Sequence, residues 1–125
     1  MEQEDKDLLL RDLCARLPYG VKCYKMTFKP ELAEEVICML RNGSHNCVQL
    51  GTFLYRLEHI KPYLFPLSSM TEEQYENFLL TNSEITLKGV ICSTRGFDFL
   101  NKHHFDYRGL IKKGLAIDAT GLNIY

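Results

Sequence analysis

Two adjacent histidines near the end of the chain have the types and spacing that look most like a reactive site. His103 and His104 stand in the stretch FLNKHHFDYRGLIKKGLAID, residues 99–118, and Asp106 follows two positions later. Imidazole and carboxylate groups are common ligands of catalytic metals, and a carboxylate can also orient a histidine that acts as a base. Neighbouring side chains on a helix diverge by about 100°, so the two histidines cannot readily share one ion. A small metal-dependent enzyme using these three residues is therefore one hypothesis, although no G-x-S-x-G motif supplies a nucleophile.

The next residues of the same stretch suit an anionic ligand. Tyr107 and Arg108 would stand where a helix begins, and backbone N–H groups at that position favour negative charge. Lys112 adds a second cation about one turn later. These residues support a second hypothesis, a binder of a small anion such as a nucleotide signal. In the structural alternative, Tyr107 packs against its neighbours and Arg108 pairs with an acid.

The elements around this stretch are expected to be helical. The spacing of Phe97 and Leu100 predicts one helix, and Asp106 is placed to cap a second helix over residues 107–113. Gly114 suits the left-handed position after that helix. The sequence LAID that follows predicts a short extended segment.

The N-terminal residues predict a helix that ends at Pro18 and Gly20. Its apolar stripe has the helical spacing i, i+3, i+4, i+7 and consists of Leu10, Leu13, Cys14 and Leu17. Acidic residues crowd its start, where the helix dipole favours them. Asp12 and Arg16 form an i,i+4 pair of the kind that adds a few tenths of a kcal/mol on a helix surface.

The region after this helix can be interpreted in two ways. Residues 21–28, VKCYKMTF, are rich in β-forming residues and predict a strand with Tyr24 and Met26 on one face. Residues 29–43 have helical spacing, a proline near the start and a glycine at the end. Residues 35–51 also fit a hairpin, with two apolar runs around a polar NGSHN turn. The hairpin is preferred because a lone strand would leave its backbone groups unpaired.

The middle of the chain predicts a connector and then a capped helix. A short strand is expected near residues 57–60, whereas the two prolines of KPYLFPLSSM, residues 61–70, argue for an ordered extended connector. Thr71 and Gln74 have the spacing of a capping box, which predicts a helix to about residue 80. Residues 84–93 predict one more strand.

Composition describes one ordinary globular domain over residues 1–125. The chain has 46% apolar and 25% charged residues, and its formal charge of −1 disfavours a partner bound mainly through phosphates, as nucleic acid is. Its five cysteines are an odd number without a C-x-x-C pair, which favours buried apolar side chains over a zinc site. No nucleotide-loop, dinucleotide or metalloprotease motif indicates a cofactor. The acidic start and the lack of a long apolar run predict a cytoplasmic protein that does not cross a membrane.

Three sequence blocks occur in this order: DLCARLPYGVKC, IKPYLFPLSSMTEEQ and LNKHHFDYRGLIKKGLAIDA. Together they resemble an uncharacterised family of short proteins from gut bacterial genomes and their phages, with patterns such as LCARLPYGV, KPYLRPLSSMTEEE and HHFDYRGLIEKGLALEA. The resemblance implies no activity, but it implies variable, strand-like sequence between the first two blocks and so favours the hairpin at 36–50. The chain departs from the pattern at Phe65, where Arg is common, and at Lys112, where Glu is common. An anion site using a basic residue after Leu64 is therefore in doubt for this chain.

The elements together predict an α+β fold: a small antiparallel sheet with an N-terminal helix and C-terminal helices, for which an SH3-like partial barrel is one candidate form. Since no catalytic constellation is assembled, the leading hypothesis is a non-enzymatic cytosolic binding or adaptor protein, encoded by a phage or mobile element. Its partner would be a protein or a small anionic ligand.

Overall fold

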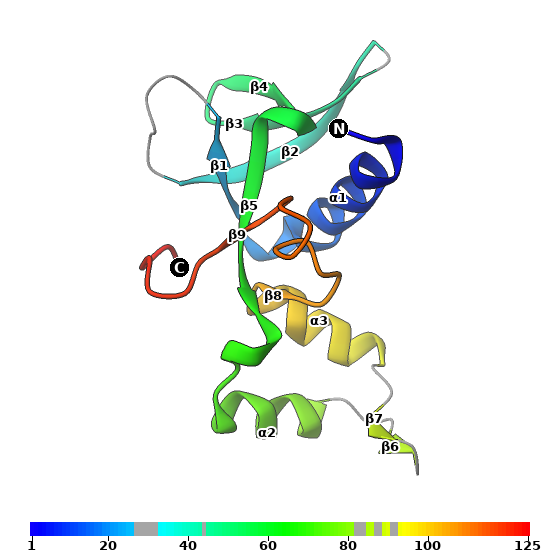
Figure 1. Cartoon of the computed structure of the whole chain (residues 1–125), viewed down its shortest axis with the longest axis vertical. Coiled ribbons are helices and arrows are strands. Elements are labelled where there is room, and N and C mark those ends of the chain that lie inside the picture. The colour runs from blue at the N-terminus through cyan, green and yellow to red at the C-terminus, as the bar shows by residue number, and fades with distance from the viewer. Residues whose placement is uncertain (27–32, 44, 82–84, 87–88, 91–92) are drawn as a thin grey trace.

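A computed structural model describes residues 1–26, 33–43, 45–81, 85–86, 89–90 and 93–125. It confirms the α+β class, with an N-terminal helix, a mostly antiparallel sheet and two helices in the C-terminal half. The sheet and helix α1 (Gln3–Arg16) lie at one end of the long axis, and α2 (Glu72–Thr81) and α3 (Thr94–Lys102) lie at the other (Figure 1). Strand β5 (Ile60–Pro66) runs from the first end towards the second.

The described strands form a seven-stranded sheet in the order β4-β3-β2-β1-β5-β8, and β9 also pairs with β5. The other strands are β1 (Lys22–Lys25), β2 (Glu34–Asn42), β3 (His45–Leu50), β4 (Phe53–Arg56), β8 (Phe105–Asp106) and β9 (Ile117–Asp118). Strands β1 to β5 pair antiparallel, whereas β8 and β9 run parallel to β5. The end strands β4 and β8 do not pair with each other, so this is an open sheet and no SH3-like partial barrel is shown among the described strands.

The predicted hairpin is confirmed within the described residues. Strands β2 and β3 pair in antiparallel register from Val36–Leu50 to Asn42–His45, and Gly43 in the turn has a positive φ of 64°. Residues 30–32, where helix and strand patterns competed, lie outside the described part. The hairpin is preferred over the helix because β1 and β4 flank it and complete its hydrogen bonding.

Strand β5 corrects the prediction of an extended connector at residues 61–70. The prolines at 62 and 66 are tolerated because the partners of β5 change along its length. Its residues 60–62 pair with β1, 63–64 with β9, and 65–66 with β8. Each proline lacks one backbone N–H donor, and each stands at the end of a paired segment, where β5 loses little by this. The expected strand at 57–60 is also wrong for its first three residues, which form the 3₁₀ turn η2 (Leu57–His59).

The core lies between α1 and the sheet. The buried face of α1 is rotated by one residue from the apolar stripe that the sequence predicts. Leu9, Asp12, Leu13 and Arg16 form the buried face, whereas Cys14 is exposed. Two of the buried residues are charged, which an apolar pattern cannot indicate. The buried core cluster consists of Leu9, Leu13, Val21, Cys23, Val36, Val48, Leu50, Leu57, Ile60, Leu64, Leu110, Leu115 and Ala116.

The buried face of β1 is the one opposite to the Tyr24 and Met26 face. Val21, Cys23 and Lys25 are buried, while Met26 is half exposed, and residues 27–28 of the predicted strand lie outside the described part. The Lys25 ammonium group is neutralised by Glu34 at 2.8 Å. A buried lysine therefore takes a position that alternation alone would assign to an apolar residue.

The C-terminal half departs from the predictions in two places. Strands β6 (Ile85–Thr86) and β7 (Gly89–Val90) form a short hairpin instead of one strand, and residues 84, 87–88 and 91–92 of that prediction lie outside the described part. The helix predicted at 107–113 is replaced by turns, because Gly109 has a φ of 74° that a right-handed helix cannot contain. The capping box of α2 is confirmed: the Gln74 side chain accepts from the Thr71 backbone at 2.9 Å, and the Thr71 hydroxyl accepts from the Gln74 backbone at 3.1 Å.

Candidate functional site

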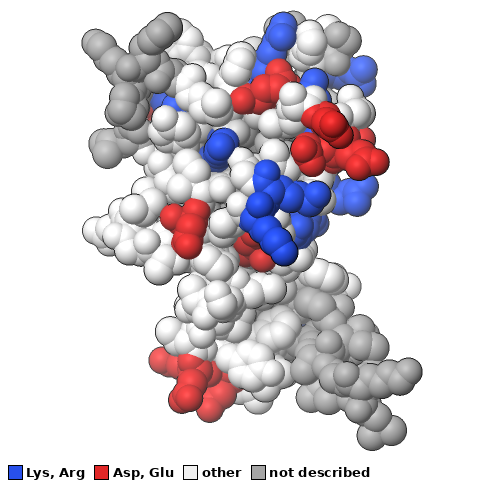
Figure 2. All heavy atoms as spheres, viewed as in Figure 1, with Lys and Arg blue, Asp and Glu red and all other residues white. Residues whose placement is uncertain are grey.

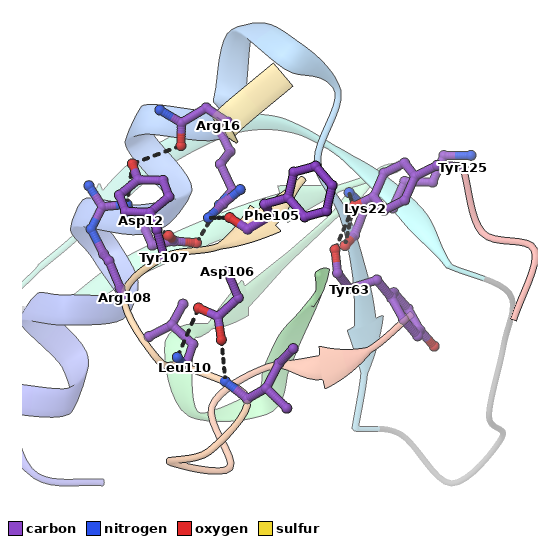
Figure 3. A network of polar contacts seen from close by, with 12 residues as sticks. Asp12, Arg16, Lys22, Tyr63, Phe105, Asp106, Tyr107, Arg108, Leu110 and Tyr125 are labelled. Carbon is purple, nitrogen blue, oxygen red and sulfur yellow. Dashed lines mark hydrogen bonds and ion pairs between the residues drawn. The ribbon is translucent and has the colours of Figure 1, made fainter. Parts of the chain in front are cut away.

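A buried polar network links the first and third sequence blocks (Figure 3). Asp12 and Arg16 on α1 are fully buried and form an ion pair of 2.8 Å. Arg108 reaches the other carboxylate oxygen of Asp12, also at 2.8 Å. A second donor of Arg16, Nη2, reaches the backbone oxygen of Phe105 at 2.6 Å. The i,i+4 pair expected on a helix surface is instead the centre of a tertiary contact across 96 residues of sequence.

Tyr107 completes this network between the two guanidinium groups. Its ring lies 5.2 Å from the guanidinium carbon of Arg16 and 4.5 Å from that of Arg108. Its hydroxyl accepts from Arg108 at 2.7 Å and donates to the Asn101 side-chain oxygen at 2.9 Å. Tyr107 and Arg108 are thus occupied by residues of the chain itself, as in the structural alternative.

Asp106 has the capping role that the sequence indicated, although it caps turns and not a helix. Its two carboxylate oxygens accept from the backbone N–H groups of Leu110 at 2.9 Å and Ile111 at 3.0 Å (Figure 3). Lys112 is exposed and forms no ion pair with any described residue. The structure therefore does not bring Lys112 together with Tyr107 and Arg108 at one open site.

The two histidines lie in different environments at the C-terminal end of α3. His103 is half-buried and its ring is 4.4 Å from that of Phe99. His104 is buried, has a left-handed φ of 62°, and stacks on Tyr125 at 3.6 Å with an interplanar angle of 10°. Burial, together with the positive charge of Arg16, lowers the pKa of His104 to about 4, so its ring is neutral at pH 7. Burial and the neighbouring Lys102 also lower the pKa of His103.

The Tyr125 side chain bridges β1 and β5 by hydrogen bonds to the backbone of both strands. The Tyr125 hydroxyl accepts from the Lys22 backbone N–H at 2.9 Å and donates to the Tyr63 backbone oxygen at 2.8 Å (Figure 3). The Lys22 ammonium group also donates to the Ile124 backbone oxygen at 3.0 Å. Burial of the hydroxyl raises the pKa of Tyr125, so it stays protonated. These contacts hold the last residues against the sheet and beside His104.

An apolar groove lies where the second and third sequence blocks meet. Its volume is about 620 Å³, and it is lined by Leu67, Met70, Thr71, Glu72, Tyr75, Phe78, Phe97, Leu100 and Tyr107. These residues come from the turn η3 (Leu67–Ser69), from α2 and α3, and from the segment after β8. Three large side chains remain exposed there: Leu67 by 47%, Tyr75 by 50% and Phe97 by 41%.

A second cavity of about 500 Å³ lies near the junction between η3 and α2, and it is called the polar cavity because its lining is more polar than that of the groove. It is lined by Phe65, Ser69, Thr71, Gln74, Lys102, His103, His104, Phe105, Thr120, Gly121 and Tyr125. Both predicted histidines contribute to this cavity, whereas Tyr107 contributes to the apolar groove. Thr71 lines both. Neither hollow was predicted, because each is assembled from separate segments of the chain: residues 67–78 and 97–107 for the groove, and residues 65–74, 102–105 and 120–125 for the cavity.

Within the described residues, no group of three or more His, Cys, Asp or Glu side chains is placed to hold a metal ion. Cys23 and Cys47 are buried and Cys38 is half-buried, while Cys92 lies outside the described part. No helix among the described residues is both long and apolar enough to span a membrane. Comparisons of the chain with protein-family models, with curated proteins and with solved structures found no match.

Proposed function

We propose that this chain is a non-enzymatic binding or adaptor protein that takes a short apolar segment of another protein into the groove between η3, α2 and α3. The observation that carries the proposal is the apolar lining of a groove of about 620 Å³ that keeps aromatic side chains in contact with water. Large exposed apolar patches on a folded protein commonly mark interaction sites. Grooves between helices are also a common place for an amphipathic segment to dock.

The weak burial of α2 supports an occupant at this position. No residue of α2, all of which the structure describes, is buried. A helix of ten residues is marginal in isolation and normally depends on packing of its apolar face. Phe78 packs on Phe99 of α3 at 5.8 Å between ring centres, but Tyr75 leaves half of its surface exposed. A bound segment would cover this face and stabilise α2.

The charge around the groove indicates that the occupant is basic. Glu72 lines the groove, and Glu73 and Glu76 are exposed on the same helix. None of these three forms an ion pair with a described residue. Acidic side chains gather over the start of α2, beside uncharged surface (Figure 2). The complementary ligand is a peptide with one or two large apolar anchors flanked by Lys or Arg.

The proposal can be tested by selecting ligands from a random peptide library on the purified protein. The expected result is enrichment of peptides that combine a large apolar residue with neighbouring basic residues. Tyr75→Ser and Phe97→Ser should each weaken a selected peptide about tenfold or more, as the loss of a buried anchor contact does at protein interfaces. Glu73→Lys should weaken it less and make binding less dependent on salt.

The matched control is Phe53→Ser. Phe53 lies on β4, at the opposite end of the molecule from α2, and its side chain is 68% exposed. This variant removes the same side chain as Phe97→Ser, so it should bind the selected peptide with unchanged affinity. Circular dichroism would establish that all variants remain folded. The proposal fails if selection yields no consensus, if the consensus is acidic, or if Phe53→Ser loses as much affinity as Phe97→Ser.

A further inference from the structure

The polar cavity beside His104 differs from the groove in its chemistry and carries a separate inference. It lies between the start of α2, the end of α3 and the last residues of the chain. Its volume of about 500 Å³ is within the usual range for small-molecule sites. We propose that this cavity binds a small anion bearing a flat ring, of the nucleoside phosphate class.

Aromatic side chains supply walls for a flat ring. Phe65 is partly exposed, and its ring lies 6.0 Å from Tyr125 and 6.3 Å from Phe105. The orientation of the Tyr125 ring is fixed by its stacking on the His104 ring. Stacking of a base on such a preformed aromatic surface contributes about 1–3 kcal/mol in proteins that bind nucleic acid bases.

The charge of the lining favours an anion. The Lys102 side chain lines the cavity, is exposed, and forms no ion pair with a described residue. Among the described residues that line the cavity, none is an aspartate or a glutamate. His103 stands next to Lys102 and, as a neutral ring, can still donate one hydrogen bond to a phosphate oxygen. A phosphate near Lys102 would meet a cation without displacing an existing partner.

Hydrogen-bonding groups at the wall are not all satisfied by the chain. The Nδ1 atom of His104 is buried and has no hydrogen-bond partner among the described residues. Thr71 and Gln74 use one oxygen each in the capping box, which leaves the Thr71 hydroxyl hydrogen and the Gln74 amide N–H groups to face a ligand.

The geometry of His104 shows that its position is imposed by the surrounding structure. A φ of 62° is rare for a residue with a side chain and costs about 1 kcal/mol or more. The residue is fixed there because its backbone oxygen accepts from Phe65 N–H at 2.8 Å and its ring stacks on Tyr125. The His104 side of the cavity is therefore held in place by the chain itself, and such preorganisation favours affinity for a small molecule.

Isothermal titration calorimetry of the full chain would test this with the four ribonucleoside 5′-monophosphates, the four nucleosides and inorganic phosphate. At least one monophosphate should bind with a Kd below about 1 mM, and its nucleoside and inorganic phosphate should each bind at least about tenfold more weakly. Lys102→Met should weaken the monophosphate by about tenfold, because it removes the charge and keeps the apolar stem. The control Lys113→Met, at an exposed lysine outside the cavity, should leave the affinity unchanged.

Three results would overturn the inference. The first is no heat of binding from any monophosphate up to about 5 mM. The second is inorganic phosphate that binds as tightly as the best monophosphate, since the ring would then contribute nothing. The third is an equal loss of affinity in Lys102→Met and Lys113→Met. Because Phe97→Ser leaves this cavity intact, its nucleotide affinity should be unchanged, and failure of the peptide proposal would not affect the result.

Discussion

Replacing Asp12 by alanine removes a fully buried carboxylate that two arginines share. Its two ion-pair hydrogen bonds are both 2.8 Å long, and hydrogen bonds to charged groups contribute about 1.5–3 kcal/mol each. Removing one partner of a buried ion pair costs about 3–5 kcal/mol, because the remaining charge stays buried without compensation. Both estimates place the expected loss of unfolding free energy near 4 kcal/mol. Since a domain of this size has about 5–15 kcal/mol in total, Asp12→Ala should fold but only marginally.

Urea unfolding at pH 7, followed by circular dichroism, measures this loss. The control is Asp7→Ala on the same helix, because Asp7 is exposed and bonds only with Gln3 among the described residues, so its change should stay within about 0.5 kcal/mol. In a double-mutant cycle, Asp12→Ala and Arg108→Ala should show a coupling energy of about 1–3 kcal/mol. A loss under about 1 kcal/mol for Asp12→Ala, or strict additivity in the cycle, would refute the role assigned to this network.

Three further changes have defined outcomes. The pKa of His104 in the folded protein is about 4, below the ordinary value of 6.5, so the unfolded chain binds more protons as pH falls and stability declines from about pH 6.5 to pH 4. Asparagine tolerates a left-handed φ and does not titrate, so His104→Asn should reduce this fall in unfolding free energy by roughly 1–3 kcal/mol, as measured by urea unfolding. If the free energy of unfolding falls as steeply with pH in the variant, the burial of a neutral ring is contradicted. Tyr125→Phe should cost about 1–2 kcal/mol and expose the Lys22 amide to hydrogen exchange, whereas unchanged protection would exclude the hydroxyl bridge. Gly109→Ala should cost about 1 kcal/mol and Gly109→Asn less, because no atom of the described residues lies within 4 Å of an added Cβ and the two variants differ in backbone strain. Equal losses of unfolding free energy would contradict the left-handed backbone.

Local signals in the sequence predicted those elements whose stability is itself local. The capping box at Thr71 and Gln74 is made of two hydrogen bonds across three positions, and the helix it predicts is present. The hairpin at 36–50 follows from two apolar runs around a polar turn, although an equally good helical pattern overlapped it. The hairpin was preferred over the helix because the neighbouring strand needs a partner for its backbone groups. This argument concerns tertiary structure and not the local sequence.

The failed predictions share a physical cause, which is that distant partners outweighed local preference. Prolines 62 and 66 argue against a strand, yet β5 lies inside the sheet because its neighbours change at those positions. The predicted apolar stripe of α1 is one residue off, because Asp12 and Arg16 are buried as a pair. Asp12 also bonds to Arg108, and Arg16 bonds to the backbone of β8. A hydrophobic pattern assigns charged residues to the surface, so it cannot indicate a buried ion pair.

The candidate site could be predicted only in part for the same reason. The stretch around His103 and His104 does line a cavity. Arg108, which looked free to meet a ligand, is held by Asp12, and Tyr107 is held by Arg108 and Asn101. The apolar groove is lined by η3, α2, α3 and the segment after β8, and the pairing of β5 with β8 connects these parts of the chain. Exposed apolar residues such as Phe97 look like core residues in sequence, because helical spacing shows which residues share a face and not whether that face is covered.

The measurement that tests the binding proposal most directly is an NMR titration of protein labelled at its four methionine methyl groups with a library-selected peptide. Met70 lines the groove, whereas Met26 is half exposed next to β1, at the other end of the molecule. Docking in the groove predicts a saturable shift of the Met70 signal and an unchanged Met26 signal. A shift of Met26 with Met70 unchanged would show that the peptide binds on the sheet and would contradict the proposed function.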